Sequence, residues 1–170
     1  MGESPGSALE RVLEDGRLHI PIQLRWGDLD AFNHVNNTSM LKLLEEARVR
    51  AFWRPAPGES APATAILDAN LASGLLTLIA RQEIEYLAPV PYQRHPLDIQ
   101  MWFGKLGGSS VEVCYEVRSD PAAEQSALYA RATTVLVLVD AGSGHPVRLT
   151  PEMRAAWEPL VAEPLTFRRG

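Results

Sequence analysis

Two hydrophobic periods follow one another near the start of the chain. Apolar residues alternate with other residues along 19–26, and this period of two predicts a half-buried strand. The apolar members of that alternation are Ile20, Ile22, Leu24 and Trp26. From about 36 to 53 the apolar residues recur at helical spacing, so they form one stripe on a helix that ends before Pro55. The stripe consists of Met40, Leu43, Leu44, Ala47 and Ala51.

The rest of the chain predicts mainly strands. Strand-like runs cover 75–87, 97–103, 111–117 and 128–139, with turn-forming residues between them at hairpin spacing. Thr150 and Pro151 have the pattern of the N-cap and first residue of a final helix. The order of elements predicts an α+β fold, in which an antiparallel sheet carries one central helix on one face. Because such a sheet leaves an open edge strand, we expect a homodimer that pairs the edges of two protomers.

Length and composition indicate a single domain. The chain has 170 residues, 46% hydrophobic and 22% charged, which is ordinary for a globular protein with a sizeable core. We expect the domain over 18–162. Residues 1–17 form an N-terminal extension, partly disordered or folded as a short helix over about 8–15, and residues 163–170 form a C-terminal tail.

Charge and cysteine content narrow the function class. A net charge of −5 and a pI of about 5.4 argue against broad binding of nucleic acid or of anionic membranes. No apolar run reaches the roughly 20 residues that a membrane span needs. The N-terminus lacks the apolar core of a signal peptide, and the single Cys114 suits a reducing compartment, so we expect a cytoplasmic protein.

Candidate chemistry gathers where the first strand gives way to the helix. Asp28 and Asp30 lie between these elements, and His34, Asn36 and Asn37 follow directly. A carboxylate that faces a helix start can act on water or on a carbonyl carbon, while free backbone N–H groups of the helix hold an oxyanion. The spacing also fits an Asx-turn at Asp30, an ion pair of Asp28 with a nearby arginine, and helix capping by asparagine. It does not choose between the two aspartates.

Other kinds of catalytic site have little support in the sequence. There is no G-x-S-x-G elbow and no glycine-rich phosphate loop. Cys114 lies within a predicted strand and is expected to be a buried packing thiol. The four histidines are scattered without metal-ligand spacing, so we expect no metal site. Glu46 is expected to form a solvated ion pair on the helix, whereas Glu45 could face the sheet or a dimer seam.

The motif W-x-D-x-D-x-x-x-H-V-N-N from Trp26 to Asn37, followed by E-E-A-R at 45–48, resembles the hotdog-fold acyl-CoA thioesterases of the 4-hydroxybenzoyl-CoA thioesterase type. The segments 84–90, 105–110 and 137–140 are similar too, and the likeness runs from about 19 to 160. The resemblance implies a hotdog fold, in which the sheet wraps the central helix, and a homodimer or homotetramer with active sites between protomers. It also implies acyl-CoA as substrate and no metal or redox cofactor.

The resemblance assigns roles to particular residues. Asp30, the second aspartate of D-x-D, would be the nucleophile or general base. Backbone N–H groups near the helix start would bind the thioester oxygen. The residues that would form the oxyanion and substrate site are His34, Val35, Asn36, Asn37 and Thr38. Met40 and Leu44 would line the acyl pocket, and Lys105, Ser109 and Ser110 would bind the CoA portion.

Two positions depart from the family pattern. Many relatives carry glycine where this chain has Asn33, and many carry an aromatic residue where it has Met40. Asparagine tolerates the left-handed backbone conformation that glycine adopts, and methionine would favour flexible aliphatic chains. The alternatives to a hydrolase are a non-hydrolytic acyl-CoA or acyl-carrier binding protein and a hydratase on the same fold. The retained Asp30 favours the hydrolase, and the H-V-N-N motif fits a hydratase poorly.

Overall fold

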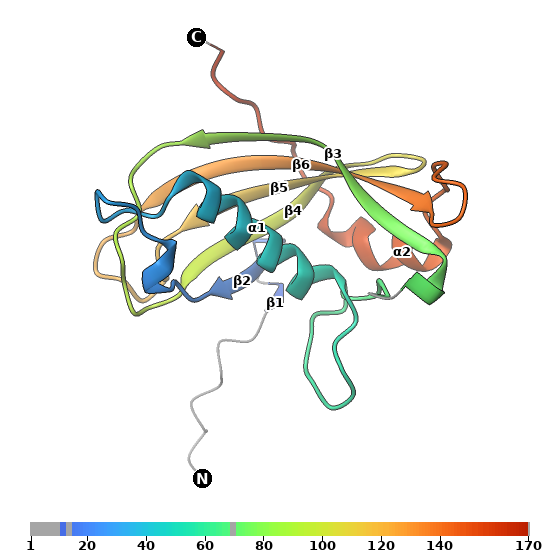
Figure 1. Ribbon diagram of the computed structural model, residues 1–170, viewed down its shortest axis with the longest axis horizontal. Coiled ribbons are helices and arrows are strands. Elements are labelled where there is room, and N and C mark those ends of the chain that lie inside the picture. The colour runs from blue at the N-terminus through green and yellow to red at the C-terminus, as the bar shows by residue number, and fades with distance from the viewer. Residues whose placement is uncertain (1–10, 13–14, 69–70, 170) are drawn as a thin grey trace.

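A six-stranded antiparallel sheet curves around one long helix (Figure 1). The computed structural model describes residues 11–12, 15–68 and 71–169. The strands are β1 (Arg11–Val12), β2 (Leu18–Ile22), β3 (Leu75–Tyr86), β4 (Leu97–Leu106), β5 (Ser110–Arg118) and β6 (Leu128–Asp140), in the spatial order β1-β2-β4-β5-β6-β3. The helices are α1 (Asn37–Phe52) and α2 (Pro151–Trp157), with short 3-10 turns η1 (Trp26–Asp28), η2 (Leu71–Ser73) and η3 (Glu158–Leu160). The predicted α+β arrangement is therefore confirmed.

The central helix α1 is fixed at both ends by its own sequence. The side chain of Asn36 accepts a hydrogen bond from the backbone N–H of Thr38, which caps the first turn. At the other end Trp53 is extended, and Pro55 follows it. The predicted apolar stripe is buried, with Leu44, Ala47 and Ala51 fully inaccessible to solvent, so α1 packs its stripe on the inner face of the sheet.

All four predicted later strands are present within a few residues of their predicted bounds. The first predicted strand is shorter than its alternation suggested. β2 ends at Ile22, and Trp26 begins the turn η1 with 72% of its surface exposed, so its prediction as part of a buried strand face is wrong. Arg25 and Asp28 form a capping pair around η1, which redirects the chain there.

Strand β3 forms one edge of the sheet. Among the described residues it pairs only with β6, and the exposed fractions of Leu78 and Ile79 are 53% and 45%. Leu78 is paired with Val137 and Ile79 with Leu136 on β6, so the two side chains point to opposite faces of the sheet. A long apolar edge strand of this kind is open to pairing with another chain.

The N-terminal extension differs from the predicted helix where it is described. Arg11 and Val12 form β1 and pair with His19 and Leu18 of β2. The prediction of a helix over 8–15 is wrong at these two residues, because the chain pairs with an exposed sheet edge there. The rest of it, apart from Asp15, lies outside the described residues. No helix in the described part of the chain is long and apolar enough to cross a membrane.

Candidate functional site

Asp30 lies in a tight loop whose backbone holds one of its carboxylate oxygens. Its Oδ1 atom accepts hydrogen bonds from the backbone N–H groups of Phe32 at 2.8 Å and His34 at 3.5 Å. The backbone N–H of Asp30 donates to His34 O, and that of Asn33 donates to Asp30 O. The predicted Asx-turn is thus present. The second oxygen, Oδ2, has no hydrogen-bond partner among the described residues, so it is available to a substrate or a water molecule.

Asp28 has a different environment, although it is only two positions away. It is 2% exposed, and both of its carboxylate oxygens are engaged by Arg25. The Nη2 atom of Arg25 donates to Oδ1 at 2.9 Å, and its backbone N–H donates to Oδ2 at 2.8 Å. The carbonyl oxygen of Asp28 accepts from the backbone N–H of Asn36. Asp28 therefore anchors the loop to the helix start.

The helix start offers fewer free donors than the sequence suggested. The backbone N–H of Asn36 is used by Asp28, and that of Thr38 donates to the side chains of Asn36 and Asn37 at 2.9 Å each. The backbone N–H of Asn37 has no acceptor among the described residues. Asn37 is also exposed, so its N–H can donate to an incoming oxyanion.

A cavity of about 310 Å³ lies beside this loop and the helix start. Val35 and Met40 line one side of it, and Tyr86 and Val90 line the other. The backbone N–H of Val35 donates to Val90 O at 2.9 Å, and His34 forms a β-bridge with Pro91, which joins the Asp30 loop to the cavity wall.

Tyr86 is a site residue that the sequence analysis did not single out. Its hydroxyl donates to Asn37 O at 3.4 Å, so the end of β3 contacts the helix start. The only sequence signal was its position in the family-like segment 84–90. Burial raises the pKa of the Tyr86 hydroxyl above its ordinary value.

The two predicted acyl-pocket residues differ in accessibility. Met40 is 2% exposed and lines the cavity beside the Asp30 loop. Leu44 lies one turn further along α1, is fully buried in the hydrophobic core and does not line that cavity. Within one chain, Met40 is therefore the member of this pair that a substrate in the cavity would meet.

The predicted CoA-binding residues lie at the other end of the sheet. Ser110 pairs with Val137 on β6, whereas Tyr86, beside the helix start, pairs with Ala130. Seven positions along β6 correspond to roughly 23 Å at about 3.3 Å per residue. A single chain thus brings Asp30, His34 and the helix start together, but leaves Lys105, Ser109 and Ser110 apart from them.

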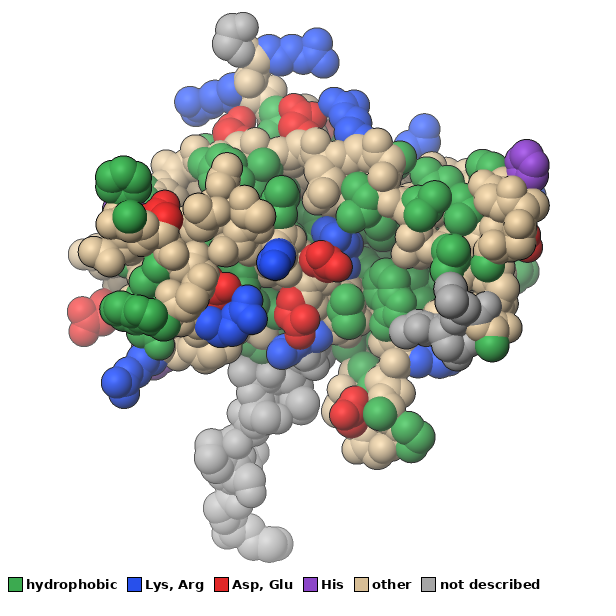
Figure 2. All heavy atoms as spheres, in the orientation of Figure 1, with side chains coloured by type: hydrophobic (Ala, Val, Ile, Leu, Met, Phe, Trp, Pro, Cys, Tyr) green, Lys and Arg blue, Asp and Glu red, His purple; other side chains and the backbone are tan. Residues whose placement is uncertain are grey.

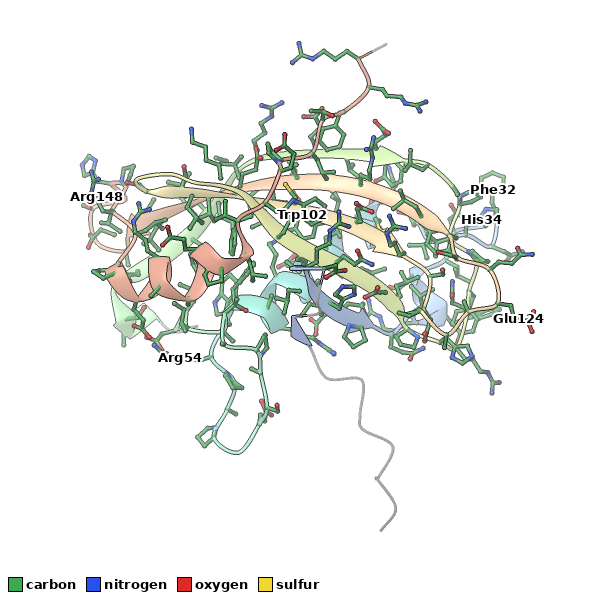
Figure 3. The ribbon with its side chains drawn as sticks, turned by 180° about the vertical axis from the view of Figure 1, so that it is seen from behind. Phe32, His34, Arg54, Trp102, Glu124 and Arg148 are labelled. Carbon is green, nitrogen blue, oxygen red and sulfur yellow. The ribbon has the colours of Figure 1, made fainter. Side chains whose placement is uncertain are left out.

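Two further basic residues, Arg148 and Arg154, lie beside the β4–β5 hairpin that contains Lys105, Ser109 and Ser110. Figure 3 shows Arg148 at the opposite end of the molecule from Phe32 and His34. The guanidinium of Arg148 lies 4.0 Å from the position that a Cβ on Gly108 would occupy, and Arg154 Nη2 donates to Gly107 O at 2.7 Å. The sequence analysis missed both arginines because they are far from the hairpin in sequence.

The structure gives no catalytic or metal-binding role to the other residues that the sequence analysis considered. Cys114 is buried, and this burial raises the pKa of its thiol, so it is poorly suited to act as a nucleophile. Glu46 forms the predicted ion pair with Arg50 at 3.0 Å, whereas Glu45 is exposed. Among the described residues, no cluster of His, Cys, Asp and Glu could hold a metal ion.

Comparisons with known proteins concern the family and the fold of this chain. The family model of the thioesterase-like superfamily matches residues 24–157. Among solved structures, a Thermus thermophilus thioesterase complexed with coenzyme A and Zn is similar at 25% identity and TM-score 0.64, over 88% of this chain and 97% of that one. No curated protein matches the chain.

Two further structures show the same fold. A probable thioesterase from Escherichia coli, YbaW, has 24% identity and a TM-score of 0.64 over 85% of this chain and 98% of that one. A thioesterase superfamily protein from Jannaschia sp. has 20% identity and a TM-score of 0.69 over 87% and 95%. The hotdog fold that the resemblance implied is thereby confirmed.

Proposed function

Because the chain belongs to the thioesterase-like superfamily, we propose that it is an acyl-CoA thioesterase of the 4-hydroxybenzoyl-CoA thioesterase type, with Asp30 as nucleophile or general base. The observation that carries the proposal is the loop geometry of Asp30. Backbone N–H groups fix its Oδ1 atom, and Oδ2 is left without a partner among the described residues. A similar structure with coenzyme A bound supports a CoA thioester as the substrate class.

The proposed reaction uses the loop and the helix start together. The thioester oxygen would accept a hydrogen bond from the backbone N–H of Asn37 at the positive end of α1. Asp30 would either take a proton from water as the water adds to the carbonyl carbon, or add to that carbon itself and be released by water. In both routes the carbon–sulfur bond breaks, and the products are the free acid and CoA. No step requires a metal ion or a redox cofactor.

The proposed active form is a homodimer built on the β3 edge. An antiparallel, twofold-symmetric pairing of two β3 strands would continue the sheet and cover Leu78 and Ile79. Such a rotation reverses the direction of the partner's sheet. It therefore carries the partner's β4–β5 hairpin to the end of the sheet that holds Asp30.

This reversal would bring the predicted CoA-binding residues of one subunit next to the Asp30 loop of the other. Lys105, Ser109 and Ser110 of one subunit would serve the Asp30 site of the other, and Arg148 and Arg154 would add positive charge beside the same hairpin. Phosphate groups of CoA would bind there, because arginine and lysine are the usual phosphate ligands.

The test follows the release of free thiol from a panel of acyl-CoAs. The variant Asp30→Asn keeps an oxygen for the N–H of Phe32, so it should fold normally. We expect it to lose at least about 100-fold in kcat/KM, which is about 3 kcal/mol of transition-state stabilisation. Asp28→Asn is the matched control, since Asp28 is engaged by Arg25, and its folded fraction should keep most of the activity.

Two results would overturn the proposal. Saturable binding of acyl-CoA without turnover of any substrate by the wild type would make the chain a non-hydrolytic binding protein. Activity that survives Asp30→Asn but disappears in Asp28→Asn would move the catalytic role to Asp28.

A further inference from the structure

A second cavity lies at the far end of the inner sheet face, between the end of α1, α2 and the start of β3. Its volume is about 350 Å³, within the roughly 300–1,000 Å³ range of small-molecule sites. Its apolar walls are formed by Trp53, Ile66, Leu67, Leu75, Leu138 and Met153. Figure 2 shows hydrophobic side chains gathered between the later part of α1 and the first part of β3. No residue of the candidate site lines this cavity.

The rim of this far cavity consists of charged side chains that pair with one another. Arg54 donates to Asp68 at 3.0 Å and to Glu152 at 3.1 Å, and all three residues line the cavity. One cation between two carboxylates leaves the rim with a formal charge of −1. A rim of this sign disfavours an anionic group and tolerates a neutral chain.

The proposed dimer would bring the far cavity to the active site of the other subunit. In a twofold antiparallel pairing over the whole of β3, Leu75 of one subunit lies opposite Tyr86 of its partner. Leu75 lines the far cavity, and Tyr86 lines the cavity beside Asp30. The two cavities therefore face one another across the interface, although they are at opposite ends of a single chain.

We infer that the acyl tail of the substrate enters the far cavity of the partner subunit, and that this cavity selects neutral aliphatic chains over chains ending in a carboxylate. The inference rests on the proposed thioesterase function and adds the part of the pocket that a single chain lacks. The thioester carbonyl stays with Asp30 and Asn37 of one subunit. The end of the chain meets Leu138, Met153 and the Arg54 rim of the other.

The test fills the far cavity and then separates the two subunits' contributions. Thr77 lines the cavity and is paired with Leu138 on the inner face, so Thr77→Phe places a ring inside it. We expect this variant to lose about tenfold or more of kcat/KM for octanoyl-CoA and to keep its activity on acetyl-CoA. The same change at the exposed Thr166 on the C-terminal tail is the matched control and should alter neither substrate. Light scattering would confirm that both variants are dimers.

A mixed dimer decides which subunit supplies the cavity. Thr77→Phe and Asp30→Asn chains carrying different tags would be co-expressed, and the doubly tagged dimer purified. If the inference holds, one of its two sites combines an intact Asp30 with an intact partner cavity, so octanoyl-CoA turnover returns to about half that of the wild type. If each chain used its own cavity, both sites would be defective and no turnover would return, which would overturn the inference.

The panel also separates this inference from the proposed function. Absence of turnover of every acyl-CoA in the panel by the wild type would refute the thioesterase itself. Turnover of other acyl-CoAs but not of octanoyl-CoA would overturn this inference alone. Equal kcat/KM for octanoyl-CoA and for its ω-carboxylated analogue would refute the selection by charge. We expect a preference of about tenfold for octanoyl-CoA, and we expect Asp68→Asn combined with Glu152→Gln to reduce it, because Arg54 then becomes free to pair with the carboxylate.

Discussion

Asn33 has a left-handed backbone conformation that shapes the Asp30 loop. Its φ is 61°, the only positive value at a non-glycine residue in the described part of the chain. Asn33→Ala should lower the free energy of unfolding by about 1 kcal/mol relative to Asn33→Gly, because a side chain without asparagine's local hydrogen bonding is strained there. Urea unfolding of the two variants measures this difference. Equal stability would show that the loop relaxes around the strain.

The same loop shows how far single residues can be predicted from the sequence. The sequence placed the candidate chemistry at 28–37, and its spacing could not choose between Asp28 and Asp30. Spacing gives the order of side chains along the chain and not their direction, and the turn η1 sets the direction here. Trp26 was predicted wrongly because the apolar alternation continues to it, whereas strand β2 ends at Ile22 and the chain turns at η1.

At the scale of elements, the spacing of the hydrophobic residues predicted helix α1 and strands β3 to β6 well. The α1 stripe and the four strands after residue 74 each have a long apolar pattern, and tertiary packing preserves such patterns. The segment 8–15 has no comparable stripe, so its prediction depended on capping residues alone. Pairing with the edge of β2 then determined the structure of Arg11 and Val12.

An ion cluster joins the N-terminal extension to the outer face of the sheet. The ring of His19 is bonded on one side to Asp98, at 3.0 Å, and on the other to Asp15, at 2.9 Å. Burial lowers the pKa of His19, but the hydrogen bonds and charges of Asp98 and Asp15 outweigh it, so the pKa is raised above 6.5. In the protonated state, His19 therefore ties residues near the start of the chain to β4.

The direction of the raised pKa predicts how stability depends on pH. The stabilisation by His19 is fully present below its unfolded pKa of about 6.5 and is lost as pH rises through the higher folded value. We expect the free energy of unfolding to fall between pH 6 and pH 9 and the fall to be smaller in His19→Gln. Unfolding in guanidinium at pH 6 and at pH 9 measures this fall in the free energy of unfolding. An identical fall in the variant would assign the effect to other groups.

At the scale of the whole molecule, the sequence predicted an open sheet edge, but it did not show which parts of the proposed site each copy would supply. The hairpin at Ser109 and the loop at Asp30 were both assigned to the site by resemblance. The distance between them follows from the directions of β5 and β6, which depend on the complete sheet. A composite site is a property of the assembly, so neither residue pattern nor spacing in one chain could reveal it.

The β3 edge should determine both the assembly and the activity of the protein. Leu78→Lys with Ile79→Lys places a charge on each face of the strand at its exposed middle, which should prevent close pairing of two copies. We expect the wild type to have twice the 18.7 kDa chain mass in solution and the variant to have the single mass at micromolar concentration. Light scattering after gel filtration measures both.

Activity should be lost together with the dimer, since the partner would supply both the CoA-binding hairpin and the acyl cavity. The control is Val161→Lys, which adds the same charge at a residue 45% exposed and away from β3. It should remain dimeric and active. A Leu78→Lys, Ile79→Lys variant that is monomeric, folded and as active as the wild type would show that one chain carries a complete site. A variant that stays dimeric would place the interface on another face of the molecule.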